Sequence, residues 1–279
     1  MKMKSKLQLL AAAVAMSAAP AFATIDTGGT GTGELFLNVV DTASGYNVSF
    51  TKDLGITASA FNGSGSYSFN LASDPEWTNF LSAISGDPNA ATDLSYDVLA
   101  LGLTTGGQKF NLLSTSNSTL ATVKTTTNSQ EAQMGGAGAI AAYVNAVNGI
   151  TGAASTMGTT TSTNGSAYEV STGSGDSAYY GNNYSTNWDN KAPFSSTASY
   201  GTSLSFYDLL QTATTGLGKV TVTQFGGGNG PGTGGQWLLS GASLASSTLV
   251  YAVPEPSTWA MLLAGLIGIG SIARRRMSV

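Results

Sequence analysis

The chain has 279 residues, of which only 9% are charged, and it contains neither cysteine nor histidine. These absences exclude disulfides, thiolate and histidine-bound metal sites, and hydrolytic triads that need a histidine base. The 36 glycines, together with abundant serine, threonine and asparagine, favour strands and loops over helices.

The beginning of the chain has the features of an export signal. A short run with three lysines precedes an apolar stretch at residues 7–16, and the small-x-small sequence Ala21-Phe22-Ala23 follows. This order is typical of a secretory signal peptide, with Ala21 and Ala23 as the signal peptidase site. A buried first helix is the alternative, but the segment lacks a charged face. We predict a signal peptide at residues 1–23, with signal peptidase and the export machinery as partners, and an exported domain at residues 24–253.

Short segments of alternating apolar and polar residues follow. Tyr46, Val48 and Phe50 alternate with polar residues, and the same period of two recurs at residues 66–71. This period is typical of strands with one packed and one solvated face, and residues 41–45 separate the first two strands as a hairpin loop. Further strand candidates are residues 33–40, 95–103, 109–113, 120–125, 203–209, 218–225, 236–240 and 247–253. The pattern predicts a mainly β fold, an antiparallel β-sandwich or jelly-roll-like domain.

Two short helices interrupt the strands. Ser73-Asp74-Pro75-Glu76 predicts a capped helix start, and apolar residues follow with helical spacing from Trp77 until Gly86. We interpret Trp77 as a core residue rather than a binding residue. The second helix is expected to begin at Asn128-Ser-Gln-Glu131, which resembles a capping box, and to end at Asn148-Gly149.

Residues 149–194 differ in character, because they are rich in Thr, Ser, Gly and Asn and carry several aromatic residues. A long irregular stretch inside a compact domain is usually functional or disordered. Aromatic rings can stack on the apolar faces of sugars while nearby amides and carboxylates bind hydroxyls. The candidate carbohydrate-binding residues are therefore Tyr179, Tyr180, Tyr184 and Trp188. The alternative is that these rings pack into the domain and hold the loop in place.

Motifs that could support catalysis are weak. Ser49-Phe-Thr-Lys52 matches the Ser-x-x-Lys pattern, but an alternating strand places Ser49 and Lys52 on opposite faces. Carboxylate pairs could serve a glycosidase or lyase only at the required carboxyl separation. The acidic pairs nearest in sequence are Asp74 with Glu76 and Asp93 with Asp97. We predict no catalytic residue, no cofactor and no metal, and a carboxylate-dependent enzyme acting on polysaccharide is the alternative.

The carboxy-terminal segment is apolar from Trp259 to Ala273, which is 15 residues, and the only arginines of the chain follow it. As a helix this segment spans roughly 22 Å, and flanking residues with extended arginine side chains can cover much of the remaining hydrocarbon core. By the positive-inside rule, the arginines stay in the cytoplasm. The sequence predicts a transmembrane helix with Arg274, Arg275 and Arg276 as the membrane stop.

Val253-Pro254-Glu255-Pro256, followed by this apolar helix and its arginine-rich end, resembles the PEP-CTERM sorting signal of Gram-negative bacteria. In that family an exosortase, an integral-membrane protease-transpeptidase, recognises the Pro-Glu-Pro element and removes the signal. Such proteins accompany exopolysaccharide production and biofilm formation. The resemblance implies a sorting signal at residues 254–279, with Pro254, Glu255 and Pro256 as the recognition element. An ordinary single-pass membrane anchor is the alternative.

The exported part carries five lysines against 14 acidic residues, a net charge of about −9, which argues against nucleic acid as a partner. The resemblance and the missing catalytic residue types lead to one hypothesis. We expect a non-enzymatic protein that is held transiently in the inner membrane and then reaches the outer surface or the extracellular matrix. Its role would be structural or adhesive, with exopolysaccharide as the candidate partner.

Overall fold

The computed structural model describes residues 24–27, 33–43, 45–103, 109–135, 139–157, 165–171, 176–183, 187–188, 190–228 and 230–253. Within them the fold is mainly β. The strands are β1 (Glu34–Asp41), β2 (Val48–Thr57), β3 (Tyr67–Asn70), β4 (Leu94–Leu103), β5 (Phe110–Ser116), β6 (Ser166–Val170), β7 (Ala198–Ser199), β8 (Leu204–Leu210), β9 (Thr221–Gln224), β10 (Gln236–Ser240) and β11 (Thr248–Ala252).

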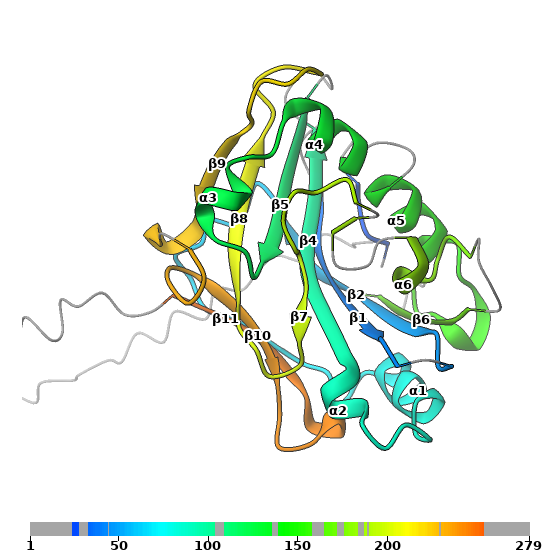
Figure 1. Cartoon of the computed structure of the whole chain (residues 1–279). Helices are drawn as coiled ribbons and strands as arrows, with labels where there is room; N and C mark the ends of the chain where they lie inside the picture. Colours follow the sequence, from blue (N-terminus) through cyan, green and yellow to red (C-terminus); the bar gives the residue numbers. More distant parts are fainter. Residues whose placement is uncertain are drawn as a thin grey trace, which may run out of the picture.

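These strands form one continuous antiparallel sheet in the order β3-β11-β10-β8-β5-β4-β1-β2-β6, while β7 pairs with β4 and β9 with β8. The helices are α1 (Pro75–Ala83), α2 (Ala90–Asp93), α3 (Leu120–Val123), α4 (Asn128–Gly135), α5 (Ile140–Asn148) and α6 (Tyr180–Asn183). Short 3₁₀ turns lie at Gly152–Ala154, Phe225–Gly227 and Leu244–Ser246. Figure 1 shows α4, α5 and α6 grouped beside one part of the sheet, and α1 at the end near β2 and β6.

The sheet curls, so that strands far apart in its order share one apolar cluster, which we call the inner core. Phe50 of β2 and Trp237 of β10 both belong to it, although β2 and β10 are separated by several strands. Helix α1 adds Trp77, whose ring lies 5.1 Å from that of Phe50 between centroids. The prediction of an antiparallel, mainly β domain is confirmed, and its sandwich-like character comes from one curled sheet rather than from two separate sheets.

A second apolar cluster, the helix-side core, lies on the other face of the central strands beneath α4, α5 and α6. Alternation along β1 assigns its side chains to the two clusters: Leu35 and Leu37 enter the inner core, whereas Phe36 enters the helix-side core. The central strands are therefore apolar on both faces, and β1 has buried residues at seven of its eight positions. Such burial requires cover on both sides.

Most of the strand predictions are confirmed, and β10 has the predicted bounds. The prediction of a strand at residues 120–125 is wrong, because these residues begin with helix α3, whose first turn is capped by the Thr119 side chain accepting from the Thr122 N–H. Sequence reasoning also missed β6 and α6, which lie inside the stretch 149–194 that was expected to be irregular.

The two expected helices are present, and the described residues also contain three short α-helices that were not expected, namely α2, α3 and α6. Helix α1 begins as predicted, with Asp74 as its N-cap and Trp77 buried. The expected second helix is divided into α4 and α5, which are separated after Gly135. Its capping box lies one residue earlier than expected, because Thr127 and Gln130 exchange side-chain to backbone hydrogen bonds.

The predicted signal peptide, including Ala21 and Ala23, lies outside the described residues, as does the sorting segment from Pro254 onward with Arg274, Arg275 and Arg276. Across the ranges given above, the structure contains no helix that is both long enough and apolar enough to cross a membrane.

Candidate functional site

The strand that precedes the predicted sorting signal is held within the sheet. Strand β11 pairs with β10 on one side and with β3 on the other, in registers that include Leu239↔Leu249 and Leu249↔Phe69. It ends at Ala252, so only Val253 separates it from Pro254. The signal is therefore joined to the folded domain by a strand with hydrogen-bonded neighbours on both edges.

The structure places the predicted sugar-binding aromatics inside the domain. Tyr179, Tyr180 and Trp188 have exposed fractions of 4%, 0% and 0%, while Tyr184 lies outside the described residues. The ring of Tyr180 stands edge-on to that of Trp188, with centroids 5.8 Å apart, and all three rings belong to the helix-side core. Stacking on a sugar requires an exposed ring face, so burial favours the alternative that these rings fasten the segment to the sheet.

Beneath these rings, a row of polar side chains crosses three neighbouring strands. Asp97 of β4, Asn38 of β1 and Thr51 of β2 are direct cross-strand partners, and all three are buried. Asn38 donates from Nδ2 to Asp97 Oδ1 over 2.9 Å, and its own Oδ1 accepts from Thr51 at 3.1 Å. Buried polar groups need hydrogen-bond partners, and a slip of one residue would move these side chains to the other face of the sheet. The row therefore helps to fix the register of the three strands.

Two tyrosines connect this polar row to the covering helices. The Tyr180 hydroxyl of α6 donates to Asp97 Oδ2, and the Tyr143 hydroxyl of α5 donates to Asn38 Oδ1 over 3.0 Å. Ser196 Oγ also donates to Asp97 Oδ2, at 3.3 Å. Asp97 is thus enclosed by donors and is fully buried, so its role in the described structure is to join the sheet to α6 and to the segment around Ser196.

Burial raises the pKa of Asp97 from 3.8 to about 7, although the hydrogen bonds from Tyr180, Asn38 and Ser196 oppose the shift. Burial likewise raises the pKa of Asp53 to about 7 and that of Glu131 to about 9. Because these folded-state values lie above the ordinary ones, the folded protein binds more protons than the unfolded chain in the intervening pH range. The free energy of unfolding must therefore fall as the pH rises through that range.

We expect the Asp97→Asn variant to lose part of this pH dependence. As the pH rises from 3.8 to about 7, titration of Asp97 lowers the unfolding free energy of the wild-type protein by up to about 4 kcal/mol. The amide of the variant does not titrate, so this loss is absent. The variant should be less stable at acidic pH by about 1–3 kcal/mol, because the new amide faces the donor group of Asn38. Urea denaturation followed by tryptophan fluorescence across this pH range measures both effects. If the unfolding free energy of the variant fell with pH as steeply as that of the wild type, the pH dependence would be assigned to other carboxyls.

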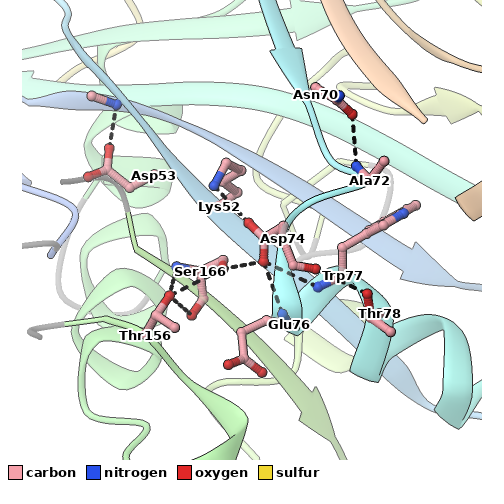
Figure 2. A network of polar contacts seen from close by, with 11 residues as sticks. Lys52, Asp53, Asn70, Ala72, Asp74, Glu76, Trp77, Thr78, Thr156 and Ser166 are labelled. Atoms are coloured by element: carbon pink, nitrogen blue, oxygen red, sulfur yellow. Dashed lines mark hydrogen bonds and ion pairs between the residues drawn. The ribbon is translucent and has the colours of Figure 1, made fainter. Parts of the chain in front are cut away.

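A second polar network joins β2, α1 and β6 (Figure 2). Asp74 Oδ1 accepts from the backbone N–H groups of Glu76 and Trp77 at 3.0 and 3.3 Å, and from Ser166 Oγ at 2.7 Å. Asp74 Oδ2 contacts Lys52 Nζ at 2.7 Å. The predicted helix cap is thus also the acceptor that fixes α1 against two strands.

Four residues that the catalytic motifs singled out, Ser49, Lys52, Asp74 and Asp97, are held in contacts on the two faces of the sheet. Ser49 and Lys52 lie on opposite faces of β2 as expected, because Ser49 Oγ accepts from the Tyr180 N–H on the helix side and Lys52 meets Asp74 on the other side. Asp74 and Asp97 belong to two different networks. Within the described ranges, no group of three or more His, Cys, Asp or Glu side chains could hold a metal ion.

Sequence reasoning missed the polar row of Asn38, Thr51 and Asp97. A local signal for it exists, since Asn38 interrupts the apolar sequence Leu35-Phe-Leu-Asn-Val-Val40, and a polar residue in a doubly buried strand needs a buried partner. The identity of that partner depends on strand pairing, which the local sequence does not reveal.

Comparison with protein-family models finds the PEP-CTERM protein-sorting motif at residues 252–276. This match confirms the resemblance at the carboxy terminus, and it begins at the last residue of β11. Comparisons with curated proteins and with solved structures find no match for the chain. The motif indicates an exported protein whose sorting to the surface depends on an exosortase.

Proposed function

We propose that this chain, which carries the PEP-CTERM sorting motif at residues 252–276, serves as a structural or adhesive component of the cell surface or extracellular matrix in association with exopolysaccharide. The sorting motif is the observation that carries this proposal. In this proposal, the chain is held transiently in the inner membrane, and the exosortase then cuts it at the Pro254-Glu255-Pro256 element. The domain that leaves the membrane then ends at or just after β11.

The composition of the exported part supports a role at a hydrated polysaccharide. Its excess of acidic residues over lysines keeps the domain soluble and discourages binding to anionic surfaces. Abundant hydroxyl and amide side chains offer the hydrogen-bonding groups that sugars require. The described domain also has a large apolar interior on both sheet faces, which suits a chain that must stay folded outside the cell without disulfides.

A catalytic role on the polysaccharide receives less support. Each of the two candidate carboxylate pairs, Asp74 with Glu76 and Asp93 with Asp97, has a member with a structural role. Asp74 caps a helix and contacts Lys52, and Asp97 is buried among three hydrogen-bond donors. Neither carboxyl is presented to solvent as a glycosidase requires. We therefore propose a non-enzymatic role.

Fractionation of a producing culture tests the proposal. The processed protein should be found with the extracellular polysaccharide, should stay there through washing at low ionic strength, and should be released when the polysaccharide is digested enzymatically. An exported protein that lacks the sorting motif serves as the control for non-specific retention in the polysaccharide. Recovery of the processed protein free in the medium, with the polysaccharide intact, would contradict the proposed association and leave the sorting assignment untouched.

A further inference from the structure

Lys52 occupies an unusual place for a lysine. It lies on the inner face of β2, directly opposite Leu37 of β1 and Ser166 of β6. Phe50 and Leu54, two residues before and after it on the same strand, belong to the inner core. The Lys52 side chain is only 13% exposed, although lysines are rarely so buried. Among the described residues, its contact with Asp74 is the one ion pair found.

The two oxygens of Asp74 have different environments (Figure 2). Three donors surround Oδ1, namely the N–H groups of Glu76 and Trp77 and the hydroxyl of Ser166. Oδ2 faces Lys52 Nζ at 2.7 Å. The carboxyl group is 5% exposed, so water has little access. An amine therefore lies within reach of a carboxyl carbon whose other oxygen is held by three hydrogen-bond donors.

We propose that Lys52 and Asp74 condense in the folded protein to form an intramolecular isopeptide bond. The donors around Oδ1 resemble an oxyanion hole, because they stabilise the negative charge that develops on that oxygen when nitrogen attacks the carbon. The sheet and α1 hold the two groups together, which removes the entropic cost of bringing them into contact. The bond would link β2 to α1 in a chain that has no cysteine for a disulfide.

The reaction needs no external reactant. Lys52 first transfers one ammonium proton to Oδ2 of Asp74, and the nitrogen lone pair then attacks Cγ. The Nζ–Cγ bond forms and the Cγ–Oδ2 bond breaks, and Oδ2 leaves as water after taking a second proton from the nitrogen. Oδ1 remains as the amide oxygen and keeps its three donors, so the helix cap persists in the product.

Tryptic digestion of the denatured full-length chain, followed by mass spectrometry, tests the proposal. Because the lysines that flank Lys52 are Lys6 and Lys109, an unlinked chain is cut after Lys52, and Asp74 appears in a separate peptide of residues 53–109. In the linked chain, Lys52 is not a trypsin site, and one peptide continues through position 52 to Lys109 with its mass lowered by one water. A missed cleavage has no such mass loss.

Matched variants identify the reacting groups. Lys52→Arg keeps the positive charge but should restore cleavage at position 52 without any mass loss, whereas Lys109→Arg should leave the link intact. Asp74→Asn should still condense and lose ammonia in place of water. Complete recovery of the free peptide ending at Lys52 from the folded wild-type protein would overturn the proposal. The wild-type digest decides the matter even if a variant fails to fold.

Discussion

Replacing Pro254, Glu255 and Pro256 with alanine is expected to leave the unprocessed chain in the inner membrane. In the proposed route, the apolar segment at residues 259–273 and the arginines after it would still stop translocation, while the proposed exosortase recognition element would be absent. Immunoblotting of membrane and extracellular fractions should show the full-length form accumulating in the first and the processed form lost from the second.

Alanine at the neighbouring Ser257 and Thr258 is the matched control, because it changes the same stretch of chain and leaves the Pro-Glu-Pro element intact. That variant should be processed normally. Normal release of the triple alanine variant would instead favour a protease that does not recognise the Pro-Glu-Pro element.

Alanine at Trp188 is expected to destabilise the domain strongly. The ring is fully buried in the helix-side core and packs edge-on against Tyr180, and removing a buried aromatic side chain typically costs about 3–5 kcal/mol of unfolding free energy. Tyr180→Ala should cost a similar amount, since it also removes a hydrogen bond to Asp97. Thermal and urea denaturation of the purified protein measure both losses.

Leu217→Ala provides the surface control, because this side chain is 86% exposed and its loss should change stability by less than about 0.5 kcal/mol. The same variants also test the sugar-binding interpretation of the aromatic residues. Should Trp188→Ala keep the wild-type melting temperature and yet weaken retention on polysaccharide, the ring would have to act at the surface.

Much of the sheet could be predicted from local pattern. Strand β10 matched its expected bounds because alternation and flanking glycines define it in a short window. Residues 120–125 misled the same reasoning, since β-branched residues favour strands, while the cap at Thr119 and the packing of Val123 in the helix-side core stabilise a helix turn there. The second expected helix is divided because its first part, α4, ends at Gly135, where the sequence has two glycines in a row and glycine is a poor helix former.

The candidate sites were harder to predict. The sorting signal is contiguous in sequence, so residues 252–276 identify it without a structure. The polar row depends on Asn38 and Asp97, which are 59 positions apart and become neighbours only through the register of β1 and β4. The aromatic residues show the limit most clearly, because composition cannot separate an exposed ring from one that covers a buried carboxylate.

The position of β11 has a consequence for the order of events during export. This strand must fit between β10 and β3, and its pairing of Leu249 with Phe69 joins segments from opposite ends of the domain. Contacts so distant in sequence form late, so the sheet can close only once residues 248–252 have crossed the membrane. In the proposed route, the next residues to arrive are those of the sorting signal, so we expect folding to be completed while the chain is still attached at the bilayer.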